Sequence, residues 1–142
     1  MSKGNVFEND WLALIFNATP IPNLADNASA APLTSLYLSL HTADPGEAGD
    51  QSSFECAYVG YARVPVTRDG AGWIVTANSV SPAANIDFPP ASGGATVATY
   101  GAIGTALSGP GKILYKGTVT PNITVSSGVT PRLTTGSIVT ED

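Results

Sequence analysis

Hydrophobic and polar positions alternate most clearly in residues 35–41, where the chain reads SLYLSLH. Leu36, Leu38 and Leu40 fall on one side of an extended strand. The other side carries Tyr37, Ser39 and His41. A period of two with leucine on one side is typical of a half-buried strand. The acidic, turn-rich residues 43–54 follow, and because they form a long connection for a hairpin, we expect this loop to fold over the rim of a sheet.

Short strand patterns recur at intervals of roughly ten residues along the rest of the chain, with Gly and Pro turns between them. They cover residues 61–67, 73–78, 85–88, 97–104, 113–119, 123–126, 131–134 and 137–140. Such a series predicts an all-β fold, with a jelly-roll-like β-sandwich as the first choice and an open immunoglobulin-like sandwich as the alternative. No segment of roughly 20 to 50 residues repeats, which excludes solenoids and propellers.

Residues 5–18 hold the one convincing helical pattern. Trp11, Leu14 and their apolar neighbours give this segment a hydrophobic surface. Glu8 and Asp10 lie in its first turn, where the helix dipole favours negative charge. Two prolines soon follow and end the pattern. We expect this short N-terminal helix either to plug the open end of the sandwich or to dock on a neighbouring molecule.

The 142 residues are enough for one domain that buries a core without disulfides or a structural metal. We expect a helix and linker in residues 1–34 and the β-sandwich domain in residues 35–142. The single cysteine, Cys56, cannot form an intrachain disulfide and is interpreted as a small packing residue. The fold is therefore compatible with assembly in a reducing cytoplasm.

Charged residues make up only 12% of the chain. Two explanations stay open: an uncharged surface rich in Thr and Ser, or a surface covered by neighbouring subunits, since interface cores are depleted in charge. The net charge of −5, with six Lys and Arg residues, leaves no basic face for nucleic acid. The sequence has no apolar run of about 18 residues and no leader pattern, so we expect neither a membrane span nor secretion.

The acidic loop is the first place to look for a metal site. Its neighbourhood carries the carboxylates of Asp44, Glu47, Asp50 and Glu55. The calcium-loop pattern requires acidic or amide side chains at its third and fifth positions, but counting from Asp44 these are Gly46 and Ala48. A solvated, turn-forming loop is therefore expected, with a divalent cation bound incidentally or at an interface as the alternative.

His41 is the only histidine, which excludes a zinc site built from several histidines. A catalytic pair with Ser52 or Cys56 would need a fixed nucleophile and an orienting carboxylate, which a flexible loop does not supply. We expect His41 to be a hydrogen-bonding residue at a strand end. The segment 109–112, GPGK, lacks the spacing of a phosphate-binding loop and is interpreted as a turn. The sequence predicts no catalytic, cofactor-binding or metal-binding residue.

Tyr58 and Tyr61 form the only close pair of aromatic residues outside the helix. They could offer a sugar-binding platform if both were exposed, but packing across the sheet is the expected role.

Several motifs carry a family resemblance. Residues 38–49 read LSLHTADPGEAG, with Glu55 and the segment GYAR at 60–63 after them. Downstream are IDFP at 86–89, YGAI at 100–103, ILYKG at 113–117 and a closing hairpin at 131–139. In this order and spacing, the motifs resemble small tailed-bacteriophage virion structural proteins. Members of this group are often labelled tail fibre or minor tail proteins, and similar chains serve as head decoration or cement proteins.

The resemblance implies a non-enzymatic virion protein with a jelly-roll-like fold, assembled in the cytoplasm of the bacterial host. We expect a capsid decoration or cement protein that binds the major capsid protein and forms a homo-dimer or homo-trimer. The alternative is a tail or tail-fibre module that recognises a host surface glycan. Candidate interface residues are Trp11, Leu14, Asp44, Glu47, Asp50, Phe54, Tyr58 and Tyr61.

Overall fold

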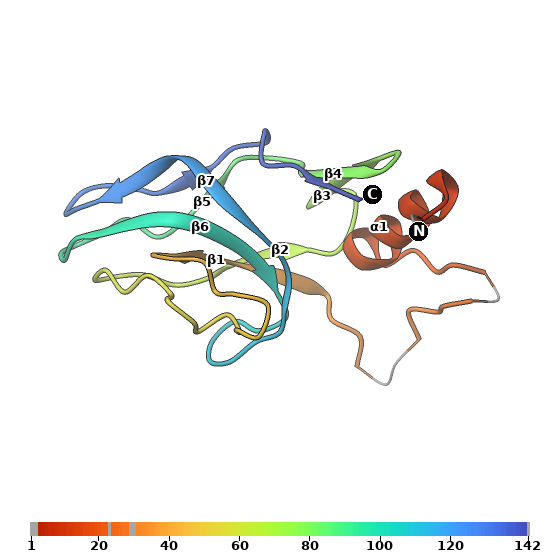
Figure 1. The fold of residues 1–142 in the computed structure, drawn as a ribbon, viewed down its shortest axis with the longest axis horizontal. Coiled ribbons are helices and arrows are strands. Elements are labelled where there is room, and N and C mark those ends of the chain that lie inside the picture. The colour runs from red at the N-terminus through yellow and green to blue at the C-terminus, as the bar shows by residue number, and fades with distance from the viewer. Residues whose placement is uncertain (1–2, 23, 29–30, 142) are drawn as a thin grey trace. The chain divides into compact units, whose positions relative to one another are not determined.

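The computed structural model describes residues 3–22, 24–28 and 31–141 (Figure 1). Contacts within the chain divide it into two compact units. Of the described residues, the first unit takes those within 1–35, 66–86 and 133–142, and the second takes 36–65 and 87–132. Neither unit is a continuous stretch of chain. The boundary expected between residues 34 and 35 stays a prediction.

A helix packed on a small sheet makes up the first unit. Helix α1 (Asn5–Asn17) lies against the antiparallel hairpin of β3 (Trp73–Thr76) and β4 (Ser79–Pro82). β4 also pairs with β9 (Val139–Thr140). The buried residues of the helix are Glu8, Leu12 and Phe16, which share one face because they are four residues apart. The predicted N-terminal helix is confirmed, and the Phe16 ring meets Trp73 edge-on with the ring centroids 4.8 Å apart.

Arg68 holds the C-terminal end of α1, where the last carbonyl groups have no partner within the helix. Its guanidinium donates hydrogen bonds to the carbonyl oxygens of Leu14, at 2.8 Å, and Ile15, at 2.7 Å. It also donates to the carbonyl of Leu33 and the side chain of Asn27, in the segment that follows the helix. Arg68 thus ties the helix end to its linker, and its charge suits the helix dipole.

A four-stranded sheet dominates the second unit. Its strand order is β2-β1-β6-β7, formed by β2 (Val64–Thr67), β1 (Ser35–His41), β6 (Thr96–Gly104) and β7 (Ile113–Val125). β6 pairs antiparallel with both β1 and β7, so that Ile103 lies opposite Leu38 on one side and opposite Tyr115 on the other. Two short strands, β5 (Ile86–Asp87) and β8 (Arg132–Leu133), form a separate pair.

These sheets confirm the all-β prediction with one short N-terminal helix, whereas the jelly-roll arrangement stays a prediction. Two details differ from the expected elements. The strands expected at 113–119 and 123–126 are one long strand, β7, whose register against β6 shifts between Ala98 and Tyr100. The strand β4 was not predicted, because its sequence SVSP offers a single large apolar residue, Val80.

The expectation of a half-buried β1 was wrong for the second half of the strand. Leu36, Leu38 and Leu40 are buried as predicted, but Ser39 and His41 on the other side are both 0% exposed. Alternation therefore identified the apolar side of β1 and misjudged the polar side. The reason is that the acidic loop and the residues that follow it bond to the polar side, as the contacts below show.

Candidate functional site

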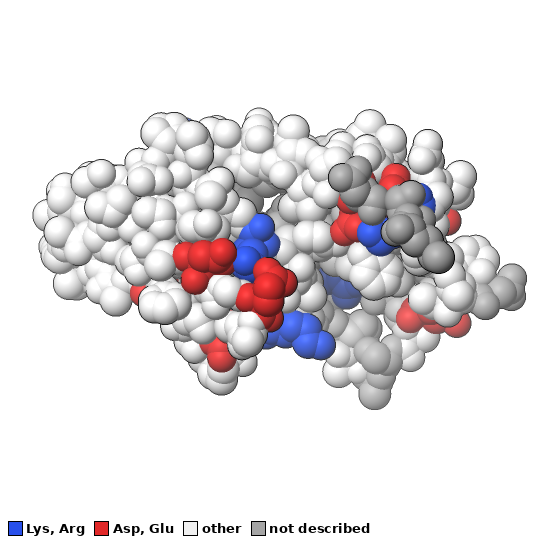
Figure 2. All heavy atoms as spheres, in the orientation of Figure 1, with Lys and Arg blue, Asp and Glu red and all other residues white. Residues whose placement is uncertain are grey.

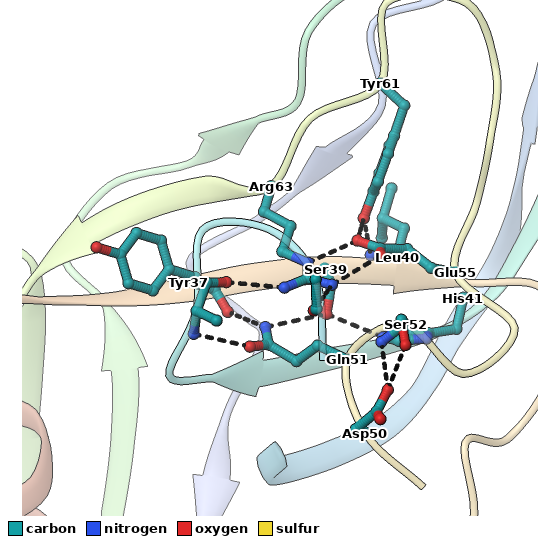
Figure 3. Close-up of polar contacts among 12 residues, drawn as sticks. Tyr37, Ser39, Leu40, His41, Asp50, Gln51, Ser52, Glu55, Tyr61 and Arg63 are labelled. Atoms are coloured by element: carbon teal, nitrogen blue, oxygen red, sulfur yellow. Dashed lines mark hydrogen bonds and ion pairs between the residues drawn. The ribbon is translucent and has the colours of Figure 1, made fainter. Parts of the chain in front are cut away.

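Gln51 anchors the acidic loop (residues 43–54) to the polar side of β1 (Figure 3). Its side chain is fully buried, and its Nε2 donates to the carbonyl oxygen of Tyr37 at 3.0 Å. Its Oε1 accepts from the backbone N–H of Ala106 at 3.0 Å. Its own N–H donates to the carbonyl of Gly111 at 2.9 Å. Gln51 thus bonds the loop to β1 and to the connection between β6 and β7.

Two glycines leave the space that Gln51 fills. A Cβ atom on Gly104 would overlap the Gln51 amide group. A Cβ atom on Gly111 would overlap Gln51 Oε1 and would also come within 2.6 Å of the Cβ of Ala106. Neither glycine has a left-handed φ, so lack of space, and not backbone conformation, requires glycine at both positions.

A directed chain of hydrogen bonds runs from Gln51 to His41. Gln51 Nε2 donates to Ser39 Oγ at 3.5 Å, and Ser39 Oγ lies 2.9 Å from His41 Nε2. His41 Nδ1 lies 2.8 Å from the carbonyl oxygen of Ser53, which can only accept. His41 therefore carries its proton on Nδ1, and the Ser39 hydroxyl donates to Nε2. Burial lowers the pKa of His41, which favours this neutral form.

Glu55 and Arg63 form a second buried group beside the loop (Figure 3). The Arg63 side chain is 2% exposed and binds both carboxylate oxygens of Glu55, at 2.7 and 2.8 Å. It also donates to the carbonyl oxygens of Ala106 and Gly109. Tyr61 donates its hydroxyl proton to Glu55 and accepts from the N–H of Leu40 in β1. The hydrogen bonds that Arg63 donates to Glu55 raise the pKa of Arg63, and burial raises the pKa of Tyr61.

The carboxylates of the acidic loop form hydrogen bonds and ion pairs within the chain. Asp44 accepts from Lys116 Nζ at 2.8 Å and from the N–H of Gly46, and the bond from Lys116 holds its pKa below the usual value. Glu47 lies 3.1 Å from the same ammonium, although its side chain is 95% exposed. Asp50 accepts from the hydroxyl and the N–H of Ser52, which lower its pKa. The carboxylates of Asp44 and Asp50 therefore stabilise turns within the loop, as the turn interpretation predicted.

Phe54 ends the loop in an unusual conformation. Its φ is 54°, a left-handed value that bulky residues rarely adopt, while its side chain is 60% exposed. The backbone around it is fixed on both sides: the carbonyl of Ser53 accepts from His41, and the carbonyl of Phe54 accepts from the N–H of Thr42 at 2.8 Å. The polar contacts thus hold an aromatic ring towards solvent.

The two tyrosines pack as expected. Their rings meet edge-on with centroids 5.3 Å apart, and Tyr58 is only 3% exposed. Its hydroxyl donates to the carbonyl of Pro89 at 2.7 Å, and Tyr61 also stacks on Phe88. A pair arranged in this way does not present two open rings to a sugar.

The two candidate interface residues of the helix, Trp11 and Leu14, lie in the first unit, on the partly exposed part of α1. Trp11 and Leu14 are both half-buried, and the Trp11 ring lies 6.4 Å from the ring of Phe7. They are in a different unit from the acidic loop. Whether any of the candidate residues contacts a partner stays a prediction.

Charged side chains are few on the face drawn in Figure 2, and acidic and basic groups there lie next to one another. Within the described residues, no group of three His, Cys, Asp or Glu side chains is placed to hold a metal ion. No helix in that part of the chain is long and apolar enough to cross a membrane.

Comparison with known families identifies a family that matches almost the whole chain. Residues 4–141 match the family described as podophage GP4 fiber I protein gp80. The chain belongs to this family. It is therefore a phage structural protein, as the sequence motifs implied. No curated protein sequence matches the chain.

In this gp80 family member, the contact between the Ser39 hydroxyl and His41 has no geometry for nucleophilic catalysis. Ser39 and His41 are both fully buried, and His41 Nδ1 donates to a backbone carbonyl where a catalytic histidine would need a carboxylate. Burial raises the pKa of Cys56, so its thiol is held in the unreactive protonated form. The hydrogen bonds of Gln51, Ser39 and His41 instead hold the acidic loop in one conformation.

Sequence reasoning missed the residues that build this arrangement. Gln51, Arg63 and the glycines at 104 and 111 were not candidates, although they carry most of the contacts. One signal was available: Glu55 and Arg63 are an acidic and a basic residue in a chain with few charges. The link between Gln51 and the two glycines, which are more than fifty residues away, has no local signature.

Proposed function

We propose that this chain is a non-enzymatic structural subunit of a phage fibre. The observation that carries the proposal is the family match over residues 4–141, because the description of that family names a fibre protein. The match covers both compact units, so it concerns the whole described chain and not a single motif.

The structure supports a role in holding and presenting surfaces. The acidic loop is held by buried polar contacts through Gln51 and His41, and Arg63 binds Glu55 directly after it. Its exposed groups include the Phe54 ring and the Glu47 carboxylate. A weakly charged surface also suits repeated contacts between subunits, since charge is depleted in interface cores. We therefore propose that the subunit forms a homo-dimer or homo-trimer.

A capsid decoration protein is the second candidate function. The observation that favours it is the lack of a fibrous repeat in the sequence, which here folds into two compact units. In that case the partner would be the major capsid protein, and apolar contact area repeated over the lattice would stabilise the particle. Glycan recognition by a fibre would have to use groups other than Tyr58, which is 3% exposed.

Cryo-electron microscopy of intact particles, combined with quantitative mass spectrometry of copy number, tests the proposal. A fibre subunit should appear in density that projects from the particle, in a number set by the count of fibres. Density spread over the head, with a copy number that matches the capsid lattice, would refute the fibre position and support decoration.

A further inference from the structure

The hydrogen bonds that hold the acidic loop through His41 require the neutral form of its ring, with one proton. The bonds from Gln51 to Ser39, from Ser39 to His41 and from His41 to the carbonyl of Ser53 all run in one direction. Because the Ser53 oxygen can only accept, Nδ1 must stay protonated, and Nε2 must stay unprotonated to accept from Ser39. A second proton on the ring would therefore require the hydrogen bond between Ser39 and His41 to reverse its direction.

Adding that proton would put two donors face to face. Protonated Nε2 would point at the Ser39 hydroxyl, which already receives the Gln51 amide at 3.5 Å. Ser39 would have to turn its own hydrogen away, into surroundings where Ser39, His41 and Gln51 are all 0% exposed. A buried donor without an acceptor and a buried charge both cost free energy.

The charged neighbours of His41 do not offset this cost. Glu55 lies opposite His41 in a backbone bridge, but Arg63 binds both of its carboxylate oxygens and Tyr61 donates to one of them. From β6, the residue opposite His41 is Tyr100. The net result is a lowered pKa for His41, with burial as the largest cause.

We propose that His41 is an acid-sensitive latch for the segment 51–54, which detaches from β1 when the ring is protonated. Opening exposes the ring to water, where it can take up the proton, so acid favours the open form. Once open, Phe54 is released from its left-handed conformation, because the carbonyl of Ser53 loses its donor. The inference concerns the loop alone and does not depend on where the chain lies in the particle.

The pH dependence follows from linkage. The open form binds the proton with a pKa near the usual 6.5, and the closed form binds it only at lower pH. Closure is therefore fully favoured above pH ~6.5 and weakens as the pH falls below it. In that window, the equilibrium constant for opening rises up to about tenfold for each pH unit, which corresponds to one proton.

Hydrogen exchange of the full chain between pH ~8 and ~5 tests the latch. After correction for intrinsic exchange rates, the amides of Gln51, Thr42 and Cys56 should lose protection as the pH falls, because their bonds close the loop. The amides of Ala83 and Glu141, bonded within the first unit, serve as internal controls and should not change. Constant protection of the loop amides throughout this range would overturn the proposal.

Two variants assign the effect to His41. His41→Gln can donate to Ser53 and accept from Ser39 without titrating, so its loop should keep its protection at low pH. If the loop of this variant opened with the same pH profile as the wild type, another group would be responsible. Ser39→Ala removes the donor that favours neutral His41, so the pKa of His41 in the closed form should rise towards that of the open form. The relative increase in opening between pH ~8 and ~5 should therefore be smaller than in the wild type. An increase as large as that of the wild type would also overturn the latch.

Discussion

The Gln51 anchor makes a quantitative prediction about two positions far apart in the sequence. In Gly104→Ala, the new methyl group overlaps the Gln51 amide, so Gln51 must leave its site. The protein then loses the bonds to Tyr37 and Ala106, at about 1 kcal/mol each, and the strain of overpacking adds about 1 to 3 kcal/mol. We expect Gly104→Ala to destabilise the second unit by about 3 to 5 kcal/mol.

The informative experiment is the double-mutant cycle. Gln51→Ala alone loses the same two bonds and should cost about 2 to 3 kcal/mol, including lost packing. With the Gln51 amide gone, the methyl of Gly104→Ala has room, so the double variant should be about as stable as Gln51→Ala. The expected coupling therefore equals the whole cost of Gly104→Ala, about 3 to 5 kcal/mol of non-additivity, well above the few tenths seen for independent sites.

Gly111→Ala provides a matched control. Its methyl would overlap Gln51 Oε1, but it would also come within 2.6 Å of Ala106 Cβ and 3.0 Å of Ala106 N. Gln51→Ala removes the first conflict and leaves the second, so rescue should be incomplete. The assay must follow the second unit directly, because Trp11 and Trp73 both lie in the first. Hydrogen exchange or tyrosine signals in denaturant are suitable, and simple additivity of Gly104→Ala with Gln51→Ala would refute the packing argument.

Two further substitutions test the charged side chains. Arg68→Ala removes the bonds to the carbonyls of Leu14 and Ile15. We expect the end of α1 to loosen, the tryptophan emission to change and about 2 to 3 kcal/mol of stability to be lost. An unchanged emission spectrum and melting temperature would contradict this role. Glu55→Gln leaves the buried Arg63 charge without its carboxylate. It should lower the stability of the second unit by about 3 to 5 kcal/mol, measured by hydrogen exchange. A loss below about 1 kcal/mol would mean that the ion pair behaves like one exposed to solvent.

The elements that follow from local periodicity were predictable. The leucines of β1 alternate strictly, and the helix is an apolar segment that prolines follow, so both were found within a residue or two. The polar side of β1 could not be assigned in this way. Ser39 and His41 have the pattern of exposed residues, but Gln51 and Ser53 of the acidic loop bond to them, and both are buried.

The space for Gln51 depends on residues that no local pattern connects to the loop. Gly104 ends β6 and Gly111 precedes β7, and each looked like an ordinary turn or strand-end glycine in the sequence. Burial of an amide side chain requires that both of its ends find partners. Such a requirement becomes visible only when the loop, β1 and the connection after β6 are placed together.

The contacts within the chain also indicate which side chains of the acidic loop are available to bind a partner. Asp44 and Asp50 use their carboxylates within the chain, for Lys116 and Ser52, so a partner would have to replace existing bonds to use them. Glu47 and Phe54 are different: the Glu47 side chain is 95% exposed, and Phe54 is 60% exposed while its backbone is held. Holding a bulky residue at a left-handed φ costs about 1 to 3 kcal/mol, which the bonds from His41 and Thr42 must offset. A residue whose backbone is fixed in this way loses little backbone entropy on binding, so of the candidate interface residues in the loop, Phe54 is the one whose removal should weaken assembly most.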